Sequence, residues 1–273
     1  GLLGLMSVLG CAGGTATPVA TTPATLDPAV LTANMCGKPE SKAVVEKPMP
    51  MFTGLAPVHY PVSSANPEVQ GYFDQGFALL YGFEYATAHR SFKKAHDLDP
   101  DCAMCGWGEA MALGPNINMP DMSPKDAAEA RGLVATAVKS SKLSERDRVL
   151  LEALAIRYAP GAPSSQGGVY TEKYADAMAQ AAKRFADDDI VAVLAAEAAM
   201  MVRPWDYWEK GGHVALPWGA KAMTLVETVL ARNPDQPEAE HLYIHLTEAS
   251  DNPKRAEASA DRLGILAPNS PHL

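Results

Sequence analysis

Two histidines four residues apart are the feature of this sequence best suited to chemistry. His241 and His245 stand at positions i and i+4 of a predicted helix, so they share one face, with Cβ atoms about 5–6 Å apart. Imidazoles at that separation can share a transition-metal ion such as zinc or copper, and a third ligand could come from His272 or Glu248. The same histidines could instead stack in a groove or hydrogen-bond to loops, and the protein would then need no cofactor.

A second candidate is the pair Cys102 and Cys105, a C-x-x-C spacing that follows Asp101, a predicted helix N-cap. The N-terminus of a helix stabilises a thiolate, so the pKa of a thiol there should fall. Gly106 stands where haem attachment needs a histidine, and no second cysteine pair follows that would complete a zinc site. We expect a local disulfide formed in an oxidising compartment. A redox or copper-handling role and two inert buried thiols are the alternatives.

Motifs of well-known catalytic sites are absent from the sequence. It contains no G-x-S-x-G, no H-E-x-x-H and no glycine loop that would cradle a phosphate. An enzyme is therefore possible only through the histidine and glutamate residues above, and a binding protein is the favoured class. The net charge of −9 gives no attraction to nucleic acid.

The elements that must position these residues are predicted to be helices almost throughout. Apolar spacing of helical period begins near residue 58, and the content of 47% hydrophobic but only 7% aromatic residues is typical of helices packed through alanine. We therefore expect an all-α fold. The predicted helices cover residues 66–82, 84–98, 101–113, 123–140, 144–158, 169–186, 189–202, 217–232, 235–249 and 252–266.

The stretch 69–102 carries a pattern of large and small residues that recurs later in the chain. Its members are Tyr72, Gly76, Leu79, Tyr85, Ala88, Phe92, Ala95 and Pro100. Later pairs that repeat the spacing of Ala88 and Pro100 are Ala222 with Pro234 and Ala256 with Pro268. The pattern resembles the 34-residue tetratricopeptide repeat (TPR), a helix–turn–helix unit. The resemblance implies a right-handed solenoid of about five hairpins, because one hairpin cannot bury its own apolar face.

Residues 102–110 with 113–118, the loop 203–208 and residues 241–245 resemble those of a group of exported bacterial TPR proteins that has no established activity. The TPR resemblance also implies which side chains line the concave groove. Carried over to this sequence, the groove residues are Phe73, Phe77, Trp107, Met111, Glu197, Met200, His241, His245 and Glu248. Such a groove suits an amphipathic helix or an extended peptide. Alternatively, its aromatic residues pack against neighbouring hairpins, and the aromatic loop 203–208 is either a lid over the groove or a plug.

The N-terminal part predicts an exported protein. Residues 1–11 resemble the end of a bacterial lipoprotein signal, with Cys11 as the lipid-bearing residue and an ordinary signal peptide as the alternative. Residues 12–57 are rich in proline, threonine and alanine, which favours an extended tether. The repeats then occupy residues 58–273, and we expect further C-terminal residues to be missing because the last unit is incomplete. A lipid on Cys11 would be the only link to a membrane.

These features together predict a module of the bacterial cell envelope, periplasmic or surface-attached, that holds a peptide or protein partner in its groove. The alternative is a metal- or redox-handling protein that uses the histidine and glutamate end of the groove and the cysteine pair.

Overall fold

The chain is all-helical in the part that the structure describes. The structure is a computed structural model, and it describes residues 48–119, 121–162, 169–270 and 272–273. Over these ranges it contains α-helices and one short 3₁₀ helix, but no strands. The elements are α2 (Pro67–Tyr81), α3 (Tyr85–Leu98), α4 (Ala103–Leu113), α5 (Pro124–Ala137), α6 (Glu145–Arg157), α7 (Val169–Arg184), α8 (Asp189–Met200), α9 (Pro217–Arg232), α10 (Pro237–Thr247), η1 (Pro253–Ala256) and α11 (Glu257–Leu266).

The prediction of an all-α fold is confirmed, and the helix ends follow from local signals. Ser123 and Ser144 are the N-caps of α5 and α6, and each accepts a hydrogen bond from a backbone N–H three residues on. The start of α4 differs, because Cys102 rather than Asp101 is its N-cap. The last predicted helix also differs at its start: the chain after Asn252 first forms the 3₁₀ turn η1 and only then α11.

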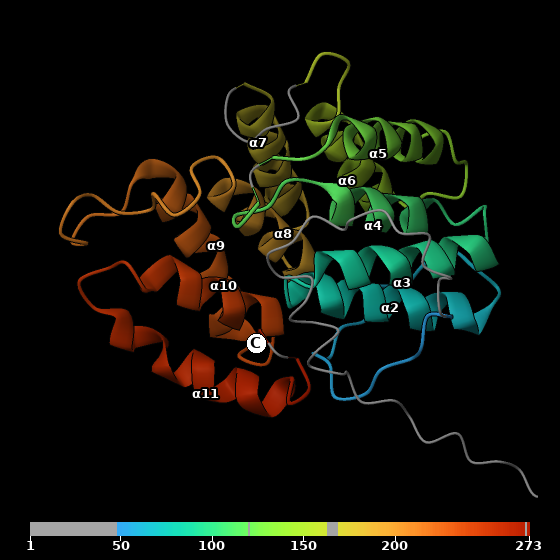
Figure 1. The fold of residues 1–273 in the computed structure, drawn as a ribbon. Helices are drawn as coiled ribbons and strands as arrows, with labels where there is room; N and C mark the ends of the chain where they lie inside the picture. Colours follow the sequence, from blue (N-terminus) through green and yellow to red (C-terminus); the bar gives the residue numbers. More distant parts are fainter. Residues whose placement is uncertain (1–47, 120, 163–168, 271) are drawn as a thin grey trace, which may run out of the picture.

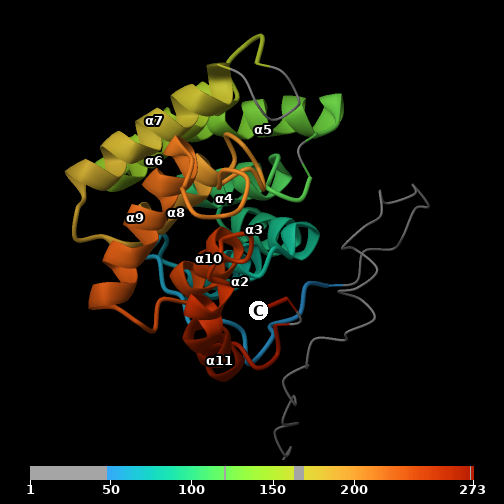
Figure 2. The ribbon, with the colours of Figure 1, turned by 90° about the vertical axis from the view of Figure 1, so that its left-hand side faces the viewer.

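Successive helices pack on one another from α2 to α11 (Figure 1). Helices two apart also meet, as α2 with α4, α4 with α6 and α8 with α10. In addition, α10 contacts α2, so the last part of the chain returns to the first hairpin. Figures 1 and 2 both place α10 beside α2, with α11 next to α10. His241 and His245 lie on α10, at this contact between the two ends of the helical array.

Close packing of the first three helices depends on two glycines. A Cβ atom at Gly76 on α2 would lie 2.7 Å from Cδ1 of Phe92, and one at Gly108 on α4 would lie 2.4 Å from the same atom. Phe92 on α3 therefore fills a gap that stays open only because both neighbours lack a side chain. Its ring meets that of Phe73 edge-on at 5.2 Å between centroids.

The segment before α2 packs along the first hairpin. Tyr60 is fully buried and its ring stacks on Phe77 at 5.8 Å, while the Tyr72 hydroxyl donates to the Met49 carbonyl at 3.0 Å. The predicted tether extended to residue 57, and its part from residue 48 onward lies against α2. Residues 12–47 of that tether lie outside the described residues.

Candidate metal centre

Helix α10 holds two of the three histidines. It begins after Gln236, whose side-chain oxygen accepts the Ala239 N–H, and Pro237 occupies its first position. The predicted relation between His241 and His245 is realised, since their Nε2 atoms lie 2.9 Å apart. His241 is buried and His245 is partly exposed, so the pair extends from the interior toward the surface.

His272 brings the third imidazole from the segment after α11. This segment is held beside the chain that precedes α2: the Asn269 N–H donates to the Gly54 carbonyl at 2.9 Å, and its amide Nδ2 donates to the Thr53 carbonyl at 2.7 Å. One ring nitrogen from each histidine lies within 4.8 Å of the other two. Two nitrogens bound to one tetrahedral zinc ion are about 3.3 Å apart, so a small movement would bring the three to a shared ion.

A carboxylate lies behind each histidine of α10. The Nδ1 atom of His245 is 3.0 Å from Oε1 of Glu248, and the Nδ1 atom of His241 is 3.5 Å from Oε2 of Glu238. In protein metal sites a carboxylate commonly accepts the outer N–H of a liganding imidazole, which fixes the ring and leaves its other nitrogen for the ion. His245 has this hydrogen bond, whereas the Nδ1 atom of His241 and the Oε2 atom of Glu238 are buried close to each other without one. The Nε2 atoms of the two rings face each other.

Two aromatic rings enclose the histidines. The Phe83 ring, in the turn between α2 and α3, lies 4.3 Å from His241, 5.6 Å from His245 and 5.2 Å from His272 between centroids. The Trp205 ring meets His245 edge-on at 5.3 Å. Among the described non-glycine residues, only Phe83 (φ 55°) and Trp205 (φ 65°) have a positive φ. Such strained backbone concentrates at functional sites, and here both instances contact the same cluster.

Burial disfavours the charged form of two of these imidazoles, because it lowers the pKa of His241 and of His272. The pKa of His241 lies well below its usual value, because burial disfavours the charged ring and because His245 and His272 are close by. Burial likewise lowers the pKa of His272, with His245 as a second cause. Since a metal ion binds the neutral form of histidine, the lowered pKa values favour metal binding at neutral pH.

The contact between the two Nε2 atoms limits where protons can lie on the rings of α10. The 2.9 Å contact between Nε2 atoms requires a proton on one of them, and in a neutral ring the Nδ1 atom then faces its carboxylate with a lone pair. A proton on Glu238 can relieve this conflict, because burial raises the pKa of that carboxyl well above its usual value. A metal ion between the Nε2 atoms relieves it too, and lets both Nδ1 atoms donate to carboxylates.

Comparison with known proteins assigns no family. No family model, no curated protein and no solved structure matches the sequence. The function must therefore be inferred from the site itself.

The other residues predicted to line a groove are mostly in the core. Trp107 stacks on Phe77 at 5.7 Å, and both rings are buried with Phe73. Met111, Met200 and Glu197 are buried as well. The aromatic side chains of the first hairpin and of α4 fill the space that the TPR resemblance assigns to an open groove. In the present arrangement these side chains contact one another rather than solvent, and their role in partner binding stays a prediction.

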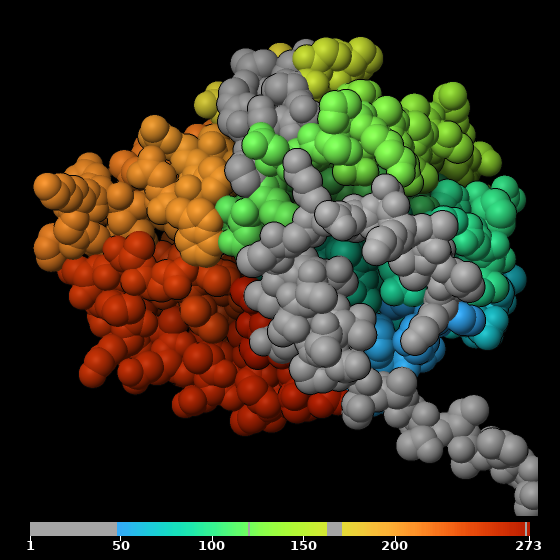
Figure 3. Space-filling view, viewed as in Figure 1, coloured from blue at the N-terminus to red at the C-terminus, as the bar shows by residue number. Residues whose placement is uncertain are grey.

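The loop 203–208 lies against the site. Trp205 donates its Nε1–H to the Ile117 carbonyl at 2.8 Å, which joins this loop to the one after α4, while Trp208 donates to the Leu246 carbonyl at 2.6 Å on α10. Figure 3 shows the orange segment that contains this loop beside the red C-terminal helices on one face of the molecule. Trp205 is 45% exposed, so it borders the site on its solvent side.

Cys102 and Cys105 form a disulfide within the first turn of α4, and both are buried. The Cys102 sulfur accepts the Cys105 N–H at 3.2 Å, which also caps the helix. The bond therefore closes a short loop at a helix start in the core. A redox or copper-handling role for this pair stays an alternative prediction.

Replacing both cysteines with serine is expected to lower the free energy of unfolding by about 2 kcal/mol, the chain-entropy value for a loop this short. Urea unfolding of the variant and of the oxidised protein would measure the difference. Adding a thiol reductant should destabilise the unsubstituted protein and leave the serine variant unchanged. An equal response of the two proteins to the reductant would contradict the assignment of the effect to this bond.

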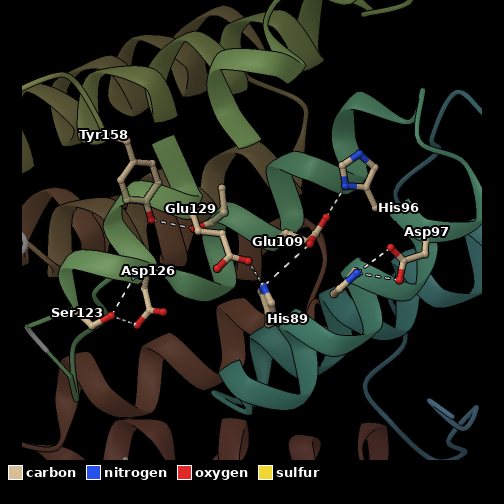
Figure 4. A network of polar contacts seen from close by, with 10 residues as sticks. His89, His96, Asp97, Glu109, Ser123, Asp126, Glu129 and Tyr158 are labelled. Carbon is tan, nitrogen blue, oxygen red and sulfur yellow. Dashed lines mark hydrogen bonds and ion pairs between the residues drawn. The ribbon is translucent and has the colours of Figure 1, made fainter. Parts of the chain in front are cut away.

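A second cluster of histidine and glutamate side chains connects α3 to α4 and α5 (Figure 4). His96 Nδ1 hydrogen-bonds to Glu109 Oε1, while His89 Nε2 lies 4.0 Å from Glu109 Oε2 and 3.9 Å from Glu129 Oε1. The signal in the sequence is that His89 and His96 are seven residues apart, two turns along one helical face. The hydrogen bond to Glu109 raises the pKa of His96, whereas burial lowers the pKa of His89. We therefore interpret the contact between His96 and Glu109 as an ion pair between α3 and α4.

The predicted lipid-bearing Cys11 lies outside the described residues. None of the helices in the described ranges is long and apolar enough to span a membrane.

Proposed function

We propose that this protein binds a transition-metal ion, zinc or copper, through His241, His245 and His272. The observation that carries the proposal is the arrangement of the two rings on α10. Their Nε2 atoms face each other at 2.9 Å while each Nδ1 atom faces a carboxylate. Neutral imidazole is a good ligand for both metals, and the third ring completes the three-histidine set typical of zinc centres that act on a substrate.

Metal analysis and calorimetry test the proposal. Protein purified without an affinity tag and dialysed against a chelator should take up one equivalent of zinc or copper, measured by calorimetric titration and by elemental analysis. Because the ligands are neutral histidines, uptake should weaken as the pH falls and protons compete for the nitrogens. Substoichiometric or non-saturable uptake of both metals would overturn the proposal.

Glu248→Gln is expected to weaken zinc binding by about 10-fold, the lower end of the effect of removing a carboxylate behind a metal ligand. An amide can still accept the Nδ1–H, but it lacks the charge that makes the imidazole a better donor. Calorimetric titration of the variant measures the change. Glu257→Gln, an exposed site on α11, is the matched control and should bind zinc as the unsubstituted protein does.

We further propose that the scaffold is a TPR-like solenoid of about five hairpins that closes on itself. Support comes from the pairwise packing of successive helices, and from small residues at the repeat positions: Ala88 and Ala222 are fully buried, and Gly76 admits the Phe92 ring. Contact between α10 and α2 supports the closure. In this proposal the repeats serve to bring the terminal histidines and the Phe83 turn together.

A peptide or protein partner, a lipid anchor on Cys11 and a location in the cell envelope remain predictions from the sequence. A partner in the groove would need the buried aromatic side chains to become accessible. Capture of a partner by the protein but not by a Phe77→Ala, Trp107→Ala variant of unchanged helicity would support that role.

A further inference from the structure

The three-histidine site lacks an obvious fourth ligand. Among the described residues, the group whose ligand atoms lie within 4.8 Å of one another consists of His241, His245 and His272 alone. The carboxylates of Glu238 and Glu248 lie at the outer Nδ1 atoms of His241 and His245 rather than at their Nε2 atoms. A zinc ion prefers four ligands, and sites with three protein ligands keep a position for an exogenous one.

We propose that the bound metal ion keeps an open coordination position that takes a small exogenous anion, beside the Phe83 and Trp205 rings. This inference rests on the proposed metal binding and adds what the metal itself binds.

The charge of the ligand set favours an anion. Three neutral imidazoles leave the full 2+ charge of the ion uncompensated by its inner ligands. Cysteine or aspartate ligands would have cancelled it. One of the three rings, His241, is only 2% exposed, and a charge in such surroundings interacts more strongly with a bound anion than it would in bulk water.

The aromatic walls limit the size of that ligand. Phe83 contacts all three imidazoles, which closes the inner side of the cluster. Trp205 borders His245 and is held by its hydrogen bond to the Ile117 carbonyl, yet 45% of it is exposed. Trp205 therefore borders the approach from solvent to His245, and we expect a small donor to fit beside the indole and a larger one to displace it. The positive φ of both aromatic residues fits a site whose walls are held in place by strain.

Cobalt(II) makes the open position visible, because its visible absorption depends on the number and kind of its ligands. The chelator-treated protein is loaded with one equivalent of cobalt(II) and titrated with azide. We expect a saturable change of the visible bands with one azide per cobalt. The His213→Ala variant, which replaces a histidine with a 74% exposed side chain, should show the same change.

Size selection is the second measurement. Benzoate should leave the spectrum of the unsubstituted protein unchanged and should alter that of Trp205→Ala, because removing the indole opens the approach.

The outcomes separate this inference from the proposed function. Cobalt or zinc bound at one equivalent with a spectrum that azide does not alter would overturn the open position and leave the metal site standing. A thiolate-to-cobalt charge-transfer band would overturn it as well, because a cysteine would then occupy the fourth position. Failure to take up either metal would overturn both proposals. A benzoate response in the unsubstituted protein equal to that in Trp205→Ala would overturn the role of the indole.

Discussion

Replacing His245 with alanine is expected to lower the affinity for zinc by more than about 100-fold. Removing a carboxylate behind a ligand costs 10–100-fold, and removing a ligand itself should cost more. His245 is the central member of the set, since its Nε2 atom lies 2.9 Å from that of His241 and its ring faces those of Phe83 and Trp205. Calorimetric titration of the chelator-treated variant measures the loss.

The controls for this prediction come from the other histidines. His213→Ala removes an exposed ring that pairs with Asp251 at 2.6 Å and should leave zinc binding unchanged. His272→Ala should weaken binding like His245→Ala, although the two rings come from different segments. Circular dichroism should show unchanged helicity in all three variants. Zinc affinity that is equal in His245→Ala and His213→Ala would contradict the three-histidine site.

The helices and the pair on α10 could be predicted because they depend on local spacing. The helical period depends on a few consecutive residues, and so does an N-cap residue such as Ser123 or Ser144. The i, i+4 relation of His241 and His245 is equally local. The sequence indicates His272 as a possible third ligand, but local spacing does not place it beside the pair on α10. Its distance from the other two rings comes from the docking of the terminal segment.

The enclosure of the site could not be predicted from local spacing. Phe83 lies far from the histidines in sequence and reaches them only because α10 packs on α2. The left-handed backbone of Phe83 and Trp205 is likewise imposed by tertiary contacts, since neither residue type favours a positive φ. The burial of Phe73, Phe77 and Trp107 could not be predicted for a related reason. The TPR resemblance assigns each residue to one side of the repeat, but the volume of these side chains decides whether that side is open to solvent.

Glu248 illustrates the limit of spacing arguments at the site itself. The sequence offered it as a further metal ligand because it follows His245 by three residues. In the structure its carboxylate lies at Nδ1 of His245, on the side away from His241. A glutamate three residues after a histidine can therefore either bind the metal ion itself or orient the histidine that binds it. Only the side-chain conformation distinguishes the two roles.

Glu197→Gln is expected to stabilise the protein at pH 8 by up to roughly 3 kcal/mol and to have little effect at pH 5. Glu197 lies on α8 in the core, and burial raises the pKa of its carboxyl to about 7, although the nearby Arg157 acts in the opposite direction. The upper limit follows from the shift between the unfolded value of 4.5 and about 7, at about 1.4 kcal/mol per pH unit.

The sign follows from proton linkage. Between pH 4.5 and about 7 the folded protein holds a proton on Glu197 that the unfolded chain has released, so stability is highest at the acidic end and falls as the pH rises through this window. Above it, the folded state contains a buried carboxylate. Glutamine has the same shape as glutamate but carries no charge, so the decrease in stability with rising pH that Glu197 causes should vanish in the variant. Glu84, whose pKa burial also raises to about 7, contributes to the same slope in both proteins.

Urea unfolding at pH 5 and pH 8 measures this effect as the difference between Glu197→Gln and the unsubstituted protein. Glu152→Gln, at an exposed site on α6, should unfold like the unsubstituted protein at both pH values. A difference for Glu197→Gln that is the same at pH 5 and pH 8 would mean that the carboxyl does not change its ionisation between them. The substitution would then act through packing, and the buried carboxylate would not be the source of the lost stability.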